Sequence, residues 1–78
     1  MSMQFDDARI ATLKHAFESA ASADGTLERR AAYQLIFNAE ERAEYSFGSF
    51  EEDLNSTNAE AGESLTFADV EKFLKDNL

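Results

Sequence analysis

The chain has 78 residues and a formal net charge of −9, and it contains neither Cys nor Pro. A chain of this length forms at most one small domain, so we expect a single domain over residues 1–78. The absence of Cys excludes disulfides, thiolate metal sites and thiol catalysis. The acid excess disfavours nucleic acid and anionic lipid as partners. It would attract a basic partner, or it only keeps a small domain in solution.

The N-terminal residues MSMQFDD lack the basic and apolar regions of a signal peptide. No apolar run approaches the roughly 20 residues that cross a bilayer. We therefore expect a soluble, cytoplasmic protein without a membrane partner. The scarcity of Gly and the absence of Pro favour helices over a turn-rich β fold.

The first predicted helix begins at Asp6, a residue type that is typical of an N-cap. It should end within 19–23, just before the strong turn signal Asp24-Gly25. Its core face is marked by apolar residues at helical spacing, namely Ile10, Leu13, Phe17 and Ala20.

A second helix is predicted from about Leu27 to Ala43, with Thr26 as its cap. Its inner stripe should consist of Ala32, Leu35, Ile36 and Ala39. Tyr33 and Phe37 lie beside this stripe, either as rim residues of the core or as part of a partner surface. The charged end of this helix should be solvated, and it comprises Glu40, Glu41, Arg42 and Glu44.

The third and fourth helices are predicted from two capping-box signatures, Ser49 with Glu52 and Thr66 with Asp69. The third helix should run over 50–56, after a linker over 45–48 and before a polar loop over 57–64. The fourth helix should run to the C-terminus. Its core face should consist of Phe67, Val70, Phe73, Leu74 and Leu78.

The helix–loop–helix pattern occurs twice, with Leu65 of the second copy 38 positions after Leu27 of the first. The best-matching segments are Asp24-Gly25-Thr26-Leu27 and Leu65-Thr66-Phe67-Ala68-Asp69-Val70, followed by Phe73-Leu74. These segments resemble the EF-hand family, specifically one lobe of a calmodulin-like protein or a small myosin light chain. The resemblance implies an all-α pair of degenerate EF-hand units, with four helices and a minimal β-bridge between Leu27 and Leu65.

An EF-hand loop supplies oxygens from positions 1, 3, 5, 7, 9 and 12 and needs Gly at position 6. With Leu27 at position 8, the first loop has Ala20 at position 1 and Ala31 at position 12. Because alanine offers no side-chain oxygen, we expect no calcium site in this loop.

The second loop, with Leu65 at position 8, retains weak metal candidates at Asn58, Glu60, Thr66 and Asp69. Its glycine is displaced to Gly62 at position 5, and Asp69 is shorter than the usual Glu at position 12. We therefore expect an acidic solvated loop and no cofactor. A calcium or magnesium sensor or buffer acting through this loop is an alternative.

Catalytic chemistry has little support in the sequence. His15 is the only histidine, so neither a nucleophile triad nor a zinc site can be assembled, and we expect no enzyme. Ser49-Phe50-Glu51-Glu52-Asp53-Leu54 and Gly62-Glu63-Ser64-Leu65 are also similar to pieces of acyl carrier proteins. That second resemblance implies a phosphopantetheine group on Ser64. The preceding Glu63, where that family has Asp, departs from the pattern.

The EF-hand resemblance implies a non-catalytic, light-chain-like protein that binds a basic amphipathic helix largely without calcium. An IQ-type motif of an unconventional myosin is the kind of partner that it suggests. The expected partner-contacting residues are Phe17, Tyr33, Ile36, Phe37, Phe47, Phe50 and Phe73.

Overall fold

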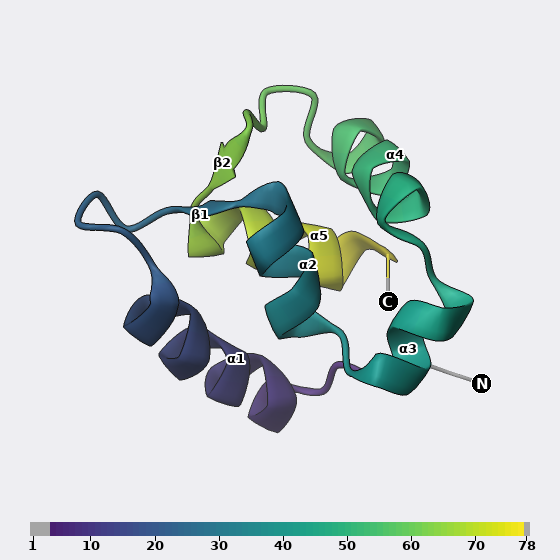
Figure 1. Ribbon diagram of the computed structural model, residues 1–78, viewed down its shortest axis with the longest axis horizontal. Helices are drawn as coiled ribbons and strands as arrows, with labels where there is room; N and C mark the ends of the chain where they lie inside the picture. Colours follow the sequence, from purple (N-terminus) through teal and green to yellow (C-terminus); the bar gives the residue numbers. More distant parts are fainter. Residues whose placement is uncertain (1–3, 78) are drawn as a thin grey trace.

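The structure is a computed structural model that describes residues 4–77, so the predicted core residue Leu78 lies outside the described part. The chain is mainly helical with one small sheet (Figure 1), as the all-α class predicted. The elements are α1 (Asp7–Ala20), β1 (Leu27–Glu28), α2 (Arg29–Ile36), α3 (Ala39–Glu44), α4 (Phe47–Thr57), β2 (Ser64–Leu65) and α5 (Phe67–Asn77).

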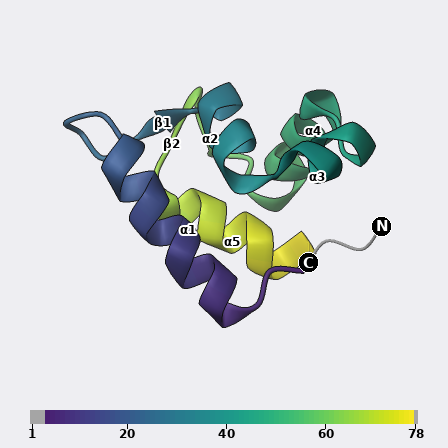
Figure 2. The ribbon, with the colours of Figure 1, turned by 60° about the horizontal axis from the view of Figure 1, so that its bottom comes forward.

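The two strands join the loop that follows α1 to the loop that follows α4. They pair antiparallel, with Leu27 opposite Leu65 and Glu28 opposite Ser64. The predicted bridge between Leu27 and Leu65 is therefore confirmed. Around it, α1 packs against α2 and α5, and α4 packs against the same two helices. Figure 2 shows α1 and α5 side by side, with α2, α3 and α4 grouped above them.

Two of the predicted helix starts are confirmed by their hydrogen bonds. The Asp6 carboxylate accepts from the Arg9 amide at 2.8 Å, which satisfies one of the free N–H groups of α1. At α5, the Thr66 amide donates to Asp69 Oδ2 at 3.0 Å and the Asp69 amide donates to Thr66 Oγ1 at 3.2 Å. This reciprocal pair is the predicted capping box.

The single helix predicted from Leu27 to Ala43 is wrong. Its first residues form β1, and the helix then breaks between Ile36 and Ala39. Asn38 starts a new helix through a capping box: its side chain accepts from the Glu41 amide at 2.9 Å, and the Glu41 carboxylate accepts from the Asn38 amide at 2.9 Å. Local capping at Asn38 therefore competes successfully with helix continuation.

The predicted start of the third helix is also wrong. Ser46, and not Ser49, caps α4, because the Ser46 hydroxyl accepts from the Ser49 amide at 3.1 Å. Phe47 and Gly48 are therefore helical, and α4 runs to Thr57. With the break at Asn38, the described residues form five helices instead of four.

The core gathers aromatic and aliphatic side chains from every helix except α3. Phe50 lies at its centre, fully buried, with its ring 5.1 Å from that of Phe73 and 5.8 Å from that of Phe37. Ala20 and Ala39, which were predicted to be internal, are exposed. The buried apolar residues are Ile10, Leu13, Phe17, Ala32, Tyr33, Ile36, Phe37, Phe50, Leu54, Leu65, Val70, Phe73 and Leu74.

Across residues 4–77, none of the helices combines the length and the apolar character that crossing a membrane would require.

Candidate functional site at the inter-loop bridge

The first loop has a left-handed turn at Gly25, the position at which the EF-hand resemblance predicts a glycine turn. Gly25, at position 6, has φ +80°, the only positive φ among residues 4–77. The Asp24 carboxylate accepts from the Thr26 hydroxyl at 2.7 Å and from the Thr26 amide at 3.2 Å. These bonds lower the pKa of Asp24. The one acidic side chain of this turn is thus bonded within the loop.

The second loop keeps more oxygen donors, but they bond to one another. Asn58 Nδ2 donates to Asp69 Oδ1 at 3.0 Å, and the other Asp69 oxygen accepts from the Thr66 amide. Asn58 Oδ1 accepts from the Glu60 amide at 3.2 Å, so all four predicted metal candidates belong to one network. Glu60 belongs to this network only through its backbone amide, and its side chain is exposed.

This donor set does not fit a calcium ion. Neither Gly62 nor Glu63 has a positive φ, so the turn that position 6 requires is absent. Within residues 4–77, no three Asp, Glu, His or Cys side chains are grouped as metal ligands would be.

Arg29, the first residue of α2, holds the second loop from outside. Its Nε donates to the Gly62 carbonyl at 2.7 Å, and its Nη2 donates to the Ala61 carbonyl at 2.7 Å. Nη2 also donates to Asn55 Oδ1 at 3.0 Å. One guanidinium therefore binds three neutral oxygens of the other helix–loop–helix unit.

The Arg29 contacts extend to a carboxylate and to the backbone. Nη1 lies 3.7 Å from Glu51 Oε2, and the Arg29 amide donates to the Glu63 carbonyl at 3.1 Å, beside the strand pairing. The Arg29 side chain is only 12% exposed. A fixed cation of the first unit thus closes the loop of the second, and Arg29 was not among the residues predicted to have a role. The contacts join residues 22 to 34 positions apart, so no local pattern indicates them.

Next to Arg29 lies an open cavity of about 320 Å³, which residues of both helix–loop–helix units line. Its one aromatic side chain is the half-buried Phe47, and the guanidinium carbon of Arg30 lies 4.4 Å from the Phe47 ring centroid. Glu28 and Glu63 are exposed, and neither forms an ion pair with a described residue. The full lining is Glu28, Arg29, Arg30, Phe47, Glu51, Glu63 and Ser64.

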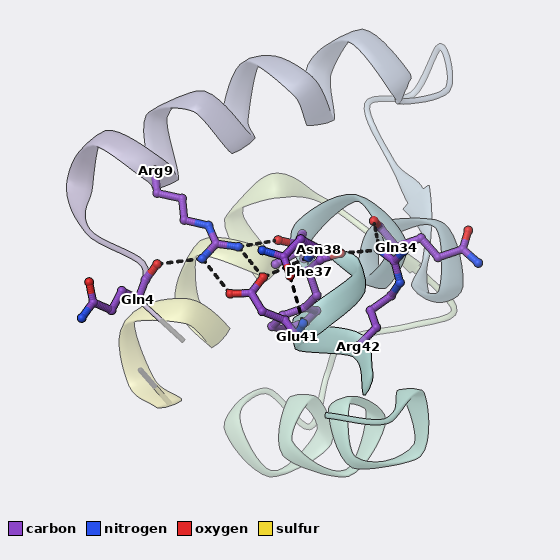
Figure 3. Close-up of polar contacts among 8 residues, drawn as sticks. Gln4, Arg9, Gln34, Phe37, Asn38, Glu41 and Arg42 are labelled. Carbon is purple, nitrogen blue, oxygen red and sulfur yellow. Dashed lines mark hydrogen bonds and ion pairs between the residues drawn. The ribbon is translucent and has the colours of Figure 1, made fainter. Parts of the chain in front are cut away.

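A second polar cluster lies at the joint between α2 and α3, away from the cavity lining (Figure 3). Arg9 of α1 makes a bidentate contact with Glu41, at 2.6 Å and 2.8 Å. Glu41 is only 3% exposed, so its prediction as part of a solvated helix end is wrong. The hydrogen bond from Arg9 is the main cause that lowers the pKa of Glu41, and it raises the pKa of Arg9 in turn.

The same cluster explains how the chain tolerates the helix break at Asn38. Arg9 Nη2 donates to the Ile36 carbonyl at 3.2 Å, and Arg42 Nη1 donates to the Gln34 carbonyl at 3.0 Å and to that of Phe37. These carbonyls belong to the end of α2, where helical partners are missing. Two arginines satisfy them, as Figure 3 shows.

The predicted partner-contacting residues are mostly internal. Phe47 is the exception, since it is half-buried and lines the cavity. The other side chains are at most 6% exposed, and they can touch a partner only if the helices separate. These are Phe17, Tyr33, Ile36, Phe37, Phe50 and Phe73. Of the two interpretations of Tyr33 and Phe37, as core residues or as part of a partner surface, the buried position of both side chains supports the first.

The two remaining candidate residues lie on the surface. His15 is exposed on α1. Ser64, the residue that the acyl-carrier resemblance singled out, is exposed in β2 opposite Glu28, ahead of the capping residue Thr66 of α5. Neither residue is hydrogen-bonded to a side chain that would activate it for catalysis among the described residues.

Comparisons of the chain with protein-family models, with curated proteins and with solved structures give no match. The EF-hand likeness therefore rests on the chain's own residues and on the geometry of its two loops.

Proposed function

We propose that this protein is a non-catalytic, light-chain-like pair of degenerate EF-hand units that binds a basic amphipathic helix without calcium. The observation that carries the proposal is the closure of the second loop by the chain itself. Arg29 binds the carbonyls of Ala61 and Gly62, and Asn58 binds Asp69. These hydrogen bonds fix the second loop, whose residue Leu65 pairs with Leu27.

The metal-independent part of the proposal follows from the charge at the loop. In a calcium-binding EF-hand, the ion's positive charge gathers carbonyl and carboxylate oxygens. Here the Arg29 guanidinium supplies positive charge to two loop carbonyls and lies near the Glu51 carboxylate. Since Asn58 and Asp69 are already bonded to each other, no observation favours the alternative of a calcium or magnesium sensor.

The choice of partner follows from the negative net charge of the protein and from the way calmodulin-like lobes bind an amphipathic helix in a groove. A net charge of −9 repels nucleic acid and attracts a cationic segment. An amphipathic helix can place basic residues against the half-buried Phe47 and the carboxylates beside it. An IQ-type helix of a larger protein, such as a myosin heavy chain, has this composition, and the proposed setting is the cytoplasm.

Calorimetric titration with a designed helical peptide tests the proposal. The peptide would be about 20 residues long, with leucines on one face and lysines and arginines on the other. The control peptide carries glutamine in place of every basic residue. In EGTA, we expect a Kd of about 1–50 μM for the basic peptide and binding at least roughly tenfold weaker for the control. No binding of the basic peptide, or equal binding of both, would reject the proposed function.

A further inference from the structure

The cavity beside the strand pair has a composition that suits one kind of side chain. It is formed by the start of α2, the start of α4 and the residues around β2, so both helix–loop–helix units contribute to it. At about 320 Å³, it can accept one long side chain rather than a helix. Its lining combines an aromatic ring with carboxylates.

The ring of Phe47 already binds a guanidinium. Arg30 lies over its face with the guanidinium carbon 4.4 Å from the centroid, within the distance of a cation–π contact. Arg30 is exposed, and the described residues offer it no acidic partner within ion-pair distance. It can therefore turn into solvent at low cost and leave the ring face to another cation.

The charges of the lining select a cation over an anion. The Nε and Nη2 donors of Arg29 are bound to loop oxygens, and its Nη1 faces Glu51. Glu28 and Glu63 also line the cavity, and their exposed carboxylates form no ion pair with a described residue. An anion entering the cavity would meet these carboxylates, and Arg30 is the only lining residue whose cation is not already bound to an oxygen of the described residues.

We infer that this cavity holds the guanidinium or ammonium group of a basic residue of the partner helix, against the Phe47 ring and between the Glu28 and Glu63 carboxylates. Arg30 occupies the ring face when the partner is absent and is displaced when it binds. The identity of the cation as a partner residue rests on the proposed function, whereas the preference of the cavity for an organic cation does not.

The cavity is tested without any partner by a small probe. N-acetyl-arginine methylamide is titrated into the labelled protein while its amide resonances are followed by NMR, with the glutamine analogue as the matched control. We expect saturable shifts confined to residues lining the cavity, foremost Phe47, Glu63 and Ser64, and none with the control. Shifts spread over all acidic surfaces, or equal shifts with both compounds, would overturn the inference.

The partner's use of the cavity is tested by variants and the basic peptide. The double variant E28Q/E63Q should weaken peptide binding about fivefold, since two carboxylate contacts are lost. The control E18Q/E52Q removes the same charge from exposed residues outside the cavity lining, and it should change the Kd by less than about twofold. R30A should strengthen binding about twofold or more, because the competing cation is gone. Circular dichroism checks that each variant is folded.

The outcomes separate the two claims. If the small probe binds in the cavity and the peptide does not bind at all, the proposed function fails and the cation site stands. If the peptide binds but both double variants weaken it equally, the partner responds to net charge alone and the inference is wrong. If R30A weakens binding, Arg30 is a contact of the partner and not its competitor, which also contradicts the inference.

Discussion

Asn58 and Asp69, which stand at the first and last positions of the second loop, are bonded directly to each other. The Asn58 amide nitrogen donates to an Asp69 oxygen at 3.0 Å, and the second Asp69 oxygen caps α5 through the Thr66 amide. In a calcium-binding EF-hand loop, which this segment resembles in sequence, side chains at the first and last positions meet at the ion. Here the ends of the loop are joined by a hydrogen bond, and no cation is needed to bring them together.

The first prediction concerns calcium. Because Asn58 and Asp69 are bonded to each other and no left-handed turn is present at Glu63, we expect no calcium binding tighter than about 1 mM. Calorimetric titration of calcium into the protein in a magnesium background measures this directly, and the same titration into buffer without protein gives the baseline. Saturable heat with a micromolar midpoint would show that the loop rearranges around the ion.

The second prediction concerns Arg29. Replacing Arg29 by methionine keeps most of the side-chain stem and removes every side-chain donor to the second loop, so the Ala61 and Gly62 carbonyls lose their partner. We expect the free energy of unfolding in urea to fall by about 2 kcal/mol. The matched variant R30M removes only an exposed cation–π contact and should cost about 0.5 kcal/mol. Equal losses would show that Arg29 is an ordinary surface residue.

The third prediction uses two glycines with different backbone conformations. Gly25 has φ +80°, so G25A should destabilise the protein by about 1 kcal/mol even though no atom lies within 4 Å of the new methyl group. Gly62 has an ordinary φ and equally open surroundings, so G62A should be neutral or slightly stabilising. Thermal unfolding of both variants checks the difference. A neutral G25A would mean that the first loop does not need its left-handed turn.

The fourth prediction concerns the ion pair between Arg9 and Glu41. Glu41 is 3% exposed and the Arg9 side chain is 28% exposed, so the pair is only partly shielded from solvent. E41Q leaves the Arg9 guanidinium without its carboxylate and should lower stability at pH 7 by about 2 kcal/mol. E40Q changes an exposed neighbour in the same helix and should cost well under about 0.5 kcal/mol.

The same pair gives a pH dependence. The hydrogen bond from Arg9 lowers the pKa of Glu41 in the folded protein. The stabilisation is therefore fully present above the unfolded pKa of about 4.3, and it is lost as the pH falls through the lower folded value. Urea unfolding of the wild type and E41Q should show a stability difference that shrinks between pH 5 and pH 2. A constant difference over that range would place the effect of E41Q in packing and not in charge.

Local sequence patterns predicted the parts of this fold that local forces decide. The caps at Asp6 and Thr66 were predicted from residues close in the sequence. The pairing of Leu27 with Leu65 was expected only because the EF-hand resemblance implies it. The break at Asn38 was missed, although its capping box with Glu41 was visible as an Asn three residues before a Glu. The prediction followed the apolar stripe, which continues past Asn38 to Ala39.

The contacts that close the structure could not be predicted in this way. Arg9 meets Glu41 across 32 positions and Arg29 meets Gly62 across 33, so neither pair has a spacing that a helix or a turn would impose. Each long basic side chain has several acidic or carbonyl partners within the same reach. Only the placement of α1 and α2 around the strand pair decides which of those partners it meets.

The most direct test of the whole account is the affinity of the basic helical peptide measured once in EGTA and once in millimolar calcium. If the chain's own groups close both loops, the peptide binds with a Kd that agrees between the two conditions within about twofold, a difference of less than about 0.5 kcal/mol. A Kd that tightens tenfold or more in calcium, or a peptide that binds in neither condition, would contradict the account.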